Sequence, residues 1–548
     1  MVRNKSVALI SFAVVTSLLV TACGGSKSAQ APSAQPSSSS GPKTLTIGIF
    51  SSPDSFNFIT NKTTYGSLVY GLIYPSLYVM NDQLQYQPSL ATSLDVNDKQ
   101  DQFVFHLNPK AKWSDGQAIT ADDVAYTIEV IAQKDTPTTR RSLIDTIQGL
   151  DKNGVSESGG LDVKGIKVKD ANTIEFDTKT PVDKDAFMEK VAAGISIMPK
   201  HTLEPFVKAN LKGLDKADIT MNPTVSGGPF KFVQYKTDSY VELAANPDYF
   251  GGKPKLDKVF FKIVNQASFT AAVQKGEIDV TSGNGTGEIS IQDWDQVSKD
   301  PNLVPVTYTA PSYQYLDFND ALPMFSKPAI REAFAHAINR PLIVQRLLHG
   351  MGEVLNTPLT STNKYYNKDI QSALQYDPAL AKKMLQDNGW DFNTEITILT
   401  PTGNAVREQS ADIIQANLQD VGVKVKIEKV DFPTRQSRSA AGQFQISLVG
   451  FSATFDPDIS SQVATGQGYN DRKYSNPQMD TLLAQGKTEV KFDSKKAVYD
   501  QIQKLFIQDV PYLPLYATKT LAVVNKRVIG AKPGPNGLDW NAVNWDVK

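Results

Sequence analysis

The sequence predicts an α/β fold, mixed α+β in the order of its elements and divided over several domains. The chain has 548 residues, and because one hydrophobic core stops growing at about 250–300 residues, at least two domains are expected. Its composition, 41% hydrophobic and 21% charged, is that of an ordinary globular protein. Segments of alternating β-branched residues follow segments of helical periodicity along the chain, which favours mixed α and β layers.

The N-terminus has the pattern of a secretory signal. Arg3 and Lys5 give a positive start, and residues 7–20 form an apolar run. That run is shorter than the roughly 20 residues that a comfortable transmembrane helix needs. Residues 1–22 are therefore predicted to be a signal peptide, and the mature chain is expected to be exported without spanning the membrane.

Cys23 is the only cysteine of the chain, so it cannot form an internal disulfide. The stretch Val20-Thr21-Ala22-Cys23 resembles a bacterial lipobox, which implies a diacylglyceryl-modified cysteine at the mature N-terminus. Residues 24–42 contain no large apolar side chain and are predicted to be disordered. Residues 23–42 are thus expected to be a lipid anchor followed by a flexible tether.

The first half of the folded part is expected to begin with a strand at 43–50. Mixed aromatic and small residues at near-helical spacing follow, and further strands are expected at 103–107 and 172–178. Between them, Thr120 with Asp123 three residues later is close to a capping box, so a helix is expected to begin there.

The second half alternates strands and helices. Residues 227–264 read as several strands joined by turns, and 268–283 as a helix, a glycine turn and a strand. Asp377 before Pro378 marks the start of a helix, and Gly389 after its last turn marks the stop. Residues 406–430 predict an amphipathic helix followed by an alternating strand.

Several function classes find no support in the sequence. The net charge of −1 provides no basic field for nucleic acid. The four histidines stand in no HExxH or comparable spacing, and there is no CxxC, so no metal site is expected. No G-x-S-x-G elbow and no complete phosphate-binding loop occur. We therefore expect a protein that is not an enzyme and that needs no cofactor.

Segments spread over nearly the whole mature chain resemble the solute-binding proteins of peptide and nickel ABC importers, the extracytoplasmic family 5 that includes oligopeptide- and dipeptide-binding lipoproteins. Each segment alone is weakly specific, but all of them occur in the family's order. They are WSDGQAITADDVAYTI (113–128), VELAANPDYFGGKPKLDKVFFKI (241–263), AAVQKGEIDV (271–280), FSKPAIREAFAHAINR (325–340), AKKMLQDNGW (381–390), ADIIQANLQDVGVKVKI (411–427) and YSNPQMDTLLAQG (474–486).

The resemblance implies a periplasmic-binding-protein-like fold of two lobes around a ligand cleft, with an extra subdomain inserted in the first lobe. The two chain crossings near residues 310 and 520 would form the hinge. The implied divisions are lobe I at 43–80, 221–310 and 520–548, the inserted subdomain at 81–220, and lobe II at 311–519.

The implied function is to capture extended oligopeptides in the cleft and to deliver them to an ABC permease that cytoplasmic ATPases drive. The protein would act as a monomer, lipid-anchored to the outer face of the bacterial cell membrane. In relatives the ligand backbone pairs with a protein strand, which gives affinity without reading sequence. Residues 450–454 are expected to be that strand, with Gly450 allowing close approach.

The resemblance also implies candidate ligand-binding residues. Peptide-binding relatives often place an aspartate where this chain has Thr454, so the ammonium anchor is expected at Asp456, with Asp458 second. A buried ammonium needs such a partner because an unpaired buried charge is costly. The full set is Gly450, Phe451, Ser452, Ala453, Thr454, Asp456 and Asp458 around the strand, Tyr315 and Asn319 past the hinge, Asp54, Phe56 and Asn57 from lobe I, and Arg435, Arg438 or Arg407 for a ligand carboxylate.

Two other interpretations stay open at this point. The same fold could bind an oligosaccharide or a metal chelate, although the tryptophans Trp113, Trp294 and Trp390 stand in structural motifs or helices and the histidines are few. A surface hydrolase or an adhesin is the other class. The lack of a catalytic constellation counts against the hydrolase, and the lack of a repeat array counts against the adhesin.

Overall fold

The computed structural model describes residues 41–216 and 218–548. The predicted signal peptide, Cys23 and nearly all of the predicted tether lie outside these residues. In the part that is described, no helix has both the length and the apolar character to cross a membrane. Residues from Pro42 onward form one compact unit.

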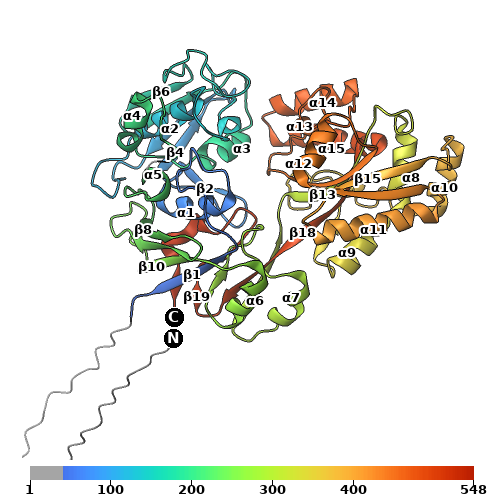
Figure 1. The fold of residues 1–548 in the computed structure, drawn as a ribbon. Helices are drawn as coiled ribbons and strands as arrows, with labels where there is room; N and C mark the ends of the chain where they lie inside the picture. Colours follow the sequence, from blue (N-terminus) through green and yellow to red (C-terminus); the bar gives the residue numbers. More distant parts are fainter. Residues whose placement is uncertain (1–40, 217) are drawn as a thin grey trace, which may run out of the picture. The chain divides into compact units, whose positions relative to one another are not determined.

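A sheet of 12 strands runs through this unit, with ten strands in the order β16-β15-β17-β13-β18-β11-β1-β10-β9-β8 and with β12 and β14 also paired to β18 (Figure 1). β1 is parallel to both of its neighbours, β10 and β11, and β15 is parallel to β16 and β17. The strands are β1 (Thr44–Ile49), β8 (Phe230–Lys236), β9 (Tyr240–Ala245), β10 (Lys258–Ile263), β11 (Val280–Thr281), β12 (Leu303–Thr309), β13 (Ser312–Phe318), β14 (Gly352–Val354), β15 (Glu395–Pro401), β16 (Lys424–Val430), β17 (Ile446–Ser452) and β18 (Tyr512–Asn525).

The long strand β18 connects the two ends of this sheet. Its first residues pair with β13 and β14, and its last residues pair with β12 and β11, all antiparallel. β12 and β13 follow each other along the chain beside it, separated only by Ala310 and Pro311. Both predicted crossings, near 310 and near 520, are therefore extended strands held by ladder hydrogen bonds, while the lobe boundaries themselves stay a prediction.

A separate sheet of four strands, in the order β4-β5-β7-β6, lies within residues 91–177. The helix α2 packs against β6 and β7. Short two-stranded ladders complete the sheet structure. The remaining strands are β2 (Tyr78–Met80), β3 (Tyr86–Pro88), β4 (Ala91–Val96), β5 (Gln102–Leu107), β6 (Ile166–Asp170), β7 (Thr173–Asp177), β19 (Val528–Ile529) and β20 (Asp546–Val547).

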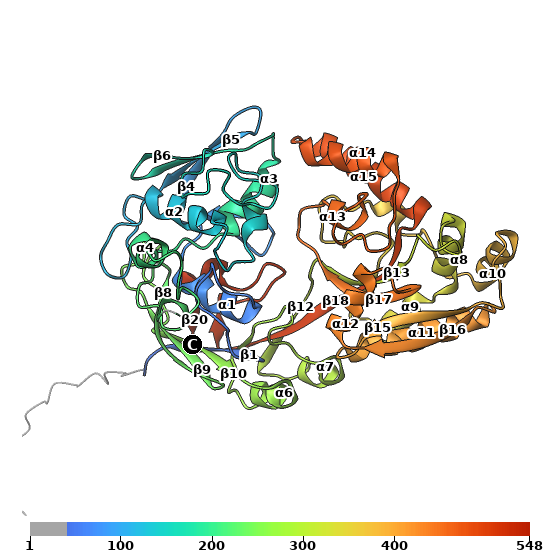
Figure 2. The ribbon, with the colours of Figure 1, turned by 45° about the horizontal axis from the view of Figure 1, so that its top comes forward.

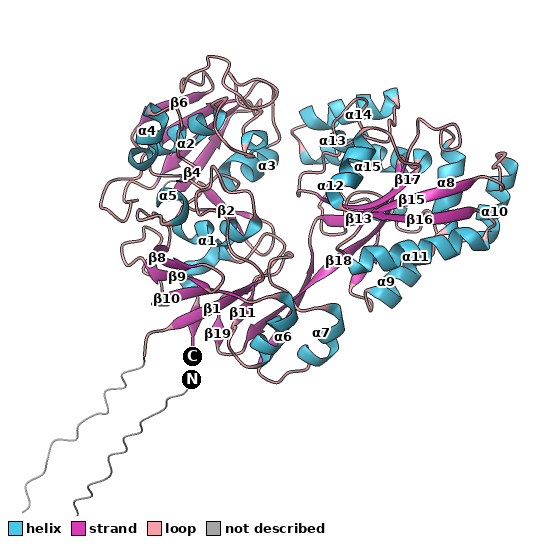
Figure 3. Ribbon diagram, in the orientation of Figure 1, coloured by secondary structure: helices cyan, strands magenta, loops and turns pink. Residues whose placement is uncertain are grey.

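Helices flank both sheets, as Figure 3 shows. α11 packs on β15 and β16, α10 packs on α8, and α14 packs on α15 (Figure 2). The helices are α1 (Thr64–Ile73), α2 (Ala121–Ala132), α3 (Lys184–Phe187), α4 (Lys200–Lys208), α5 (Asp218–Met221), α6 (Gln266–Gln274), α7 (Ile291–Val297), α8 (Pro328–Ala337), α9 (Arg340–Leu347), α10 (Pro378–Asp387), α11 (Ala405–Asp420), α12 (Phe432–Ala440), α13 (Ser460–Val463), α14 (Pro477–Thr488) and α15 (Phe492–Asp509). A π-helical turn, η2 (Met188–Ala193), follows α3, and the 3-10 turns are η1 (Arg141–Leu143), η3 (Lys368–Ile370) and η4 (Asp539–Asn544).

The structure contains the helix caps that the local sequence signals predict. The Asp377 carboxylate accepts from the backbone N–H of Leu380 at the start of α10, and Gly389 has φ of 76° just beyond its end. Asp123 accepts from the backbone N–H of Thr120 at 2.9 Å, as expected for a capping box. These caps were predicted correctly because they depend on residues only three or four positions apart.

The buried apolar residues form four clusters. The largest draws on residues 45–280 together with 524–547, and two others draw only on residues 313–517. The fourth joins residues 269–303 to the end of β18. The residues between the two crossings therefore bury much of their apolar surface among themselves.

Candidate functional site

The predicted ligand-facing segment lines a cavity at the end of β17. Its volume is about 140 Å³, and we call it the strand-end cavity. Six predicted site residues are among its lining: Phe451, Ser452, Ala453, Thr454, Asp456 and Asp458. Tyr313 of β13 and Gln462 of α13 supply polar groups on the other sides. The structure therefore brings together most of the predicted strand and both predicted carboxylates.

The same segment leaves one edge of a strand open. β17 pairs with β13 along its whole length, from Ile446 to Ser452. On its other side β15 pairs only with Ile446 and Ser447. Within the described strands, residues 448–452 thus have no partner at that edge. Free backbone N–H and C=O groups on a strand edge are a template on which a further extended chain can pair.

Gly450 and its neighbours show how the open edge is oriented. Ala453 donates its N–H to the carbonyl of Pro311, on the β13 side. Because successive backbone N–H groups alternate along a strand, the N–H of Ser452 points the other way, toward the open edge. A Cβ on Gly450 would come within 2.6 Å of the Gln314 side chain, so a larger residue would displace that amide.

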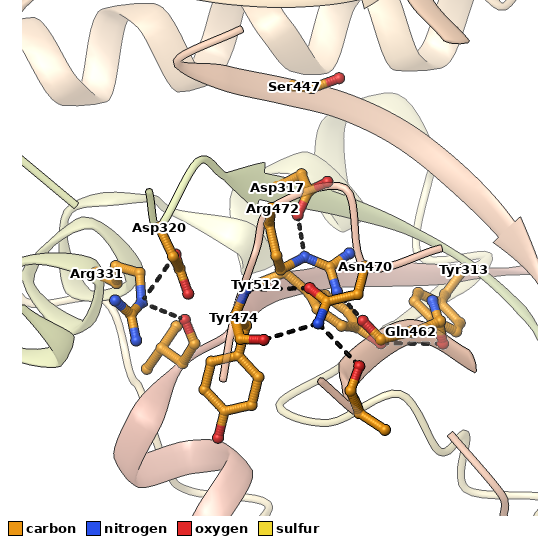
Figure 4. A network of polar contacts seen from close by, with 12 residues as sticks. Tyr313, Asp317, Asp320, Arg331, Ser447, Gln462, Asn470, Arg472, Tyr474 and Tyr512 are labelled. Carbon is orange, nitrogen blue, oxygen red and sulfur yellow. Dashed lines mark hydrogen bonds and ion pairs between the residues drawn. The ribbon is translucent and has the colours of Figure 1, made fainter. Parts of the chain in front are cut away.

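A buried network of polar side chains (Figure 4) includes Tyr313 and Gln462, which line the strand-end cavity. The hydroxyl of Tyr313 donates to Oε1 of Gln462 at 2.9 Å and lies 2.9 Å from the hydroxyl of Tyr512. Nε2 of Gln462 is buried and has no hydrogen-bond partner in the described part of the chain. A buried donor without a partner is costly, and a ligand acceptor in the cavity would relieve that cost.

Arg472 and Asp317 form a fully buried ion pair within this network. Nε of Arg472 bonds to Oδ1 of Asp317, and the two side chains are 0% and 2% exposed. Another N–H of the guanidinium donates to the backbone carbonyl of Gln462. The pair therefore fixes the loop after α13 against β13.

The two predicted ammonium anchors differ in their present partners. Asp458 caps the turn at Ser460, whose N–H it accepts at 2.9 Å, and pairs with Lys487 at 3.4 Å. Asp456 accepts only the N–H of Asp458, at 3.1 Å, and forms no ion pair within the described ranges. Burial raises the pKa of Asp456, and the charge of Lys495 only partly opposes that rise.

Asp456 also lines a second cavity, of about 230 Å³. We call it the acidic cavity. Its other walls come from the loops beside β2 and β3, from α3 and η2, from residues 362–365 and from α15. Phe455 donates its N–H to Oε1 of Glu189 at 3.0 Å across this boundary, so the segment at 455–456 touches the 81–220 region directly.

The three arginines predicted to bind a ligand carboxylate differ in whether they already have a carboxylate partner. Arg438 pairs with Glu428 at 2.6 Å and is already neutralised. Arg435 is buried, donates to the hydroxyl of Ser447 at 2.9 Å, and has no carboxylate partner in the part described. Arg407 donates to Oε1 of Gln314, and burial, with some repulsion from Arg435, lowers its pKa. Of the three, Arg435 and Arg407 keep uncompensated charge near β13.

The predicted lobe I residues are placed away from both cavities. Phe56 is fully buried, with its ring 5.2 Å from that of Phe232. Asn57 is also fully buried and accepts from the N–H of Ile59. Asp54 is exposed but ties its own loop together, since it accepts from the side-chain amide of Asn61 at 2.6 Å. The structure therefore does not bring this loop's predicted side chains to the site.

The two residues predicted past the hinge are structural supports here. Tyr315 is buried behind the network, its ring 4.9 Å from that of Tyr512. Asn319 donates to the carbonyls of Gly442 and Phe444 at 3.1 and 2.8 Å, which anchors the turn before β17. Neither lines the strand-end cavity.

Sequence reasoning missed several residues of the two cavities. Tyr313 stands two positions from Tyr315 on the same strand, and period-2 alternation could have identified it. Glu189 and Tyr365 belong to no motif. They reach the site only because α3, η2 and the 362–365 loop fold back toward residues 455–457, which no local signal predicts.

Two of the alternative solutes find little support in the site. Trp113, Trp294 and Trp390 are buried, so none of them offers an exposed stacking face for a sugar. Among the residues described, no group of three or more His, Cys, Asp or Glu side chains is arranged to hold a metal ion.

Comparison with known proteins places the chain in a family. The family model described as bacterial extracellular solute-binding proteins, family 5 Middle, matches residues 85–473. The oligopeptide-binding protein AppA of Bacillus subtilis (strain 168) is 28% identical, with 99% of each chain covered. The di/tripeptide-binding protein 1 of Pseudomonas aeruginosa (strain UCBPP-PA14) is 27% identical over 82% of this chain and 84% of its own.

Solved structures agree on the fold. AppA from Bacillus subtilis in complex with a nonapeptide superposes with a TM-score of 0.73 at 26% identity, covering 93% of this chain and 100% of that one. NikZ from Campylobacter jejuni in complex with Ni(L-His) has a TM-score of 0.72 at 22% identity, covering 92% and 99%, and supports the fold alone. The two-lobed architecture that the sequence resemblance implied is confirmed. Because the family model spans most of the chain and its members bind solutes without transforming them, this protein belongs to the bacterial extracellular solute-binding proteins of family 5 and is a binding protein, not an enzyme.

Proposed function

We propose that this protein is the substrate-binding component of an ABC importer, which captures extended oligopeptides between its two lobes and delivers them to the permease. The observation that carries the proposal is the open edge of β17 at residues 448–452, next to the strand-end cavity. An extended peptide can add to such an edge through main-chain hydrogen bonds. The peptide-binding names of the relatives support the same solute.

Main-chain pairing explains how one site accepts many sequences. The N–H of Ser452 and the groups at Gly450 would pair with the ligand backbone, which is the same for every peptide. Side chains of the ligand would project alternately into the strand-end cavity and away from it. Affinity then depends mainly on the extended backbone of the peptide, and the cavities add a preference among its side chains.

The charged ends of the peptide would be held by charged groups that lack a partner. Asp456 is the proposed ammonium anchor, because it forms no ion pair among the described residues, whereas Asp458 is paired with Lys487. Arg435, with Arg407 beside it, is the proposed carboxylate partner, because Arg438 is already paired with Glu428. Charge-assisted hydrogen bonds of this kind are about twice as strong as neutral ones.

The remaining parts of the proposal concern placement in the cell. Lipid attachment at Cys23, with 24–42 as a tether, would hold a monomer at the outer face of the membrane. Lobe I would comprise 43–80, 221–310 and 520–548, with 81–220 inserted, and lobe II would comprise 311–519. The separate hydrophobic clusters within 313–517 support this division.

Native mass spectrometry of the gently purified protein tests the solute. A mixture of co-purified peptides is the expected result, because main-chain pairing selects length and extension over sequence. A single sugar would overturn the proposal, and so would nickel with no peptide.

A further inference from the structure

A groove of about 450 Å³ lies apart from both cavities of the site. Its walls come from the end of α6, the turn before β12, the end of β18 and the last described residue. Four cationic side chains and one acidic side chain line it: Lys275, Lys526, Arg527 and Lys548, against Asp300. We call it the basic groove, since its charge is locally positive although the chain as a whole has a net charge of −1.

Most of the cations in the basic groove have no anionic partner. Arg527 is neutralised by Asp279, whose carboxylate lies 2.6 Å from the guanidinium. Asp300 accepts the backbone N–H of Asn302 at 2.8 Å and pairs with no lysine of the groove. The other three cations are exposed and form no ion pair with any described residue: Lys275, Lys526 and Lys548. An excess of positive charge therefore faces the solvent.

The basic groove adjoins the point where the predicted tether meets the folded unit. Arg527 donates to the backbone carbonyl of Thr44 at 3.0 Å, and Lys548 donates its N–H to the carbonyl of Arg527 at 2.8 Å. Lys43 pairs with Asp546 at 2.7 Å. In Figure 1, β1, β19 and the last residue accordingly lie together at one end. The first described residues and the groove thus share one set of contacts.

An apolar side chain and a further unpaired lysine lie beside the groove. Ile529 is 44% exposed and pairs with Asp546 across the β19–β20 ladder. The hydrogen bond from Lys43 lowers the pKa of Asp546, and the nearby charge of the exposed Lys255 lowers it further. Cations around an exposed apolar side chain match the boundary between lipid phosphates and acyl chains.

We propose that the basic groove docks on anionic phospholipid headgroups of the membrane that carries the protein. The inference rests on the lipid anchor of the proposed function and goes beyond it, since it brings the folded unit itself against the bilayer. As a flexible coil, residues 24–42 would reach about 25 Å on average, so the end at Lys43 would stay nearest the membrane. Lysine ammonium groups and lipid phosphates attract each other over a Debye length of about 8–10 Å.

Docking of this kind orients an anchored protein and is too weak to hold a free one. A few lysines give weak binding that salt removes, whereas lipid chains give stable anchoring. The groove residues all belong to the predicted lobe I. A docked groove would therefore hold that lobe at the bilayer and leave residues 311–519 free to close over the solute.

Lysine footprinting of the tethered protein tests the proposal. Because Cys23 is the only cysteine, the chain from Cys23 onward can be coupled there to a maleimide lipid in vesicles, whether or not cells lipidate it. Acetylation of each lysine by a neutral reagent is followed by mass spectrometry, on vesicles of phosphatidylcholine with and without phosphatidylglycerol. At low salt the three unpaired groove lysines should react at least about threefold more slowly on the anionic vesicles. High salt should remove the difference.

Three exposed lysines of residues 311–519 are the internal reference: Lys382, Lys424 and Lys504. Like the groove lysines, they form no ion pair among the described residues. Their rates should be the same on both kinds of vesicle. Equal slowing of groove and reference lysines would overturn the proposal, because the anionic surface would then act on every lysine alike.

A triple variant assigns the contact to the groove. In the native chain Lys255 should also be protected on anionic vesicles, and it should lose that protection when Lys275→Gln, Lys526→Gln and Lys548→Gln are combined. The matched control changes the three reference lysines to glutamine and should keep Lys255 protected. Peptide binding should be unchanged in both variants, because none of these lysines lines a cavity of the site. Protection of Lys255 that persists in the groove variant would contradict the proposal.

Inorganic phosphate without vesicles separates a soluble anion from a bilayer. It should leave the groove lysines as reactive as before. If phosphate slows them as much as the anionic vesicles do, the groove binds a free anion and the docking proposal fails. If no groove lysine is protected on vesicles while Cys23→Ala is released from cells, docking is wrong and the lipid anchor stands.

Discussion

At the residue scale, the site depends on which charged side chains already have partners. Sequence gives Asp456 and Asp458 equal chemistry, two positions apart. Only the fold makes Asp458 a cap and an ion-pair partner, while Asp456 forms no ion pair among the described residues. Similarly, Arg438 is paired with Glu428, whereas Arg435 donates only to the Ser447 hydroxyl and has no carboxylate partner among the described residues.

The buried pair of Asp317 and Arg472 carries the first prediction. Asp317→Asn should lower the free energy of unfolding by about 3–5 kcal/mol, because it leaves the buried Arg472 charge uncompensated. Urea unfolding followed by tryptophan fluorescence measures this.

Glu428→Gln is the matched control, since it breaks the more exposed pair with Arg438. Pairs of that kind contribute at most about 1 kcal/mol. Equal losses in the two variants would mean that the Asp317 carboxylate is not held in a buried pair.

At the element scale, the π-helical turn η2 and the end of β17 do most to shape the site. A π-helical turn inserts an extra residue in the helix, and such turns are frequent at functional sites. Here it places Glu189 against the backbone of Phe455. β17 supplies its open edge because β15 stops pairing after Ser447.

Glu189 predicts a pH dependence of stability. Burial raises its pKa to about 7, above the ordinary glutamate value of 4.5. Between these two pH values Glu189 keeps a proton in the folded protein that it releases in the unfolded chain. The resulting stabilisation of the folded state is full below about pH 4.5 and is lost as the pH rises through 7.

The ligand-free protein should therefore lose stability from pH 5 to pH 8, and Glu189→Gln, which cannot ionise, should lose less. The difference between the two proteins should be on the order of 1–3 kcal/mol, at most about 1.4 kcal/mol for each pKa unit. Urea unfolding at both pH values measures it, and parallel pH profiles would contradict the assignment. Other buried carboxylates, such as Glu129, are common to both proteins and cancel.

The open edge of β17 predicts a period-two pattern in ligand modification. N-methylation of single amides along a bound peptide should weaken binding at alternate positions, because only every second N–H points at the strand. Each such loss should be about 1–3 kcal/mol where a buried carbonyl is left without its donor. Calorimetry with an N-methyl series measures it, and losses with no alternation would exclude strand addition.

At the scale of the whole molecule, binding and anchoring belong to different parts of the chain. The cavities lie within residues 80–495, which the structure describes, and the predicted anchor is Cys23. Two packed bodies joined by β12–β13 and by β18 suit a protein that closes on a solute. In this arrangement residues 455–456 already touch the 81–220 region.

Cys23→Ala should release a binding-competent protein from cells. The lipid chains contribute about 0.8 kcal/mol per buried methylene, and without them nothing in the predicted scheme holds the chain at the membrane. Immunoblots of washed membranes and culture medium measure the partition, and peptide binding by the released protein is the control. Retention of the variant on washed membranes would contradict lipidation at Cys23.

The sequence by itself determined the fold class, most of the predicted elements and the family. Caps such as Asp377 and alternating strands such as 424–430 can be predicted from the sequence because they depend on residues a few positions apart. The segment at 450–458 was predicted from the family resemblance, and six of its residues line one cavity.

Only the tertiary structure decided which residues share a cavity. Glu189 and Phe455 are 266 positions apart and meet through one hydrogen bond. Phe56, predicted to face the ligand, is instead buried against Phe232, because an aromatic side chain in a loop is stabilised by whatever apolar surface the fold brings to it. The function of a carboxylate is set by its neighbours in space, and the order of the residues along the chain does not contain that information.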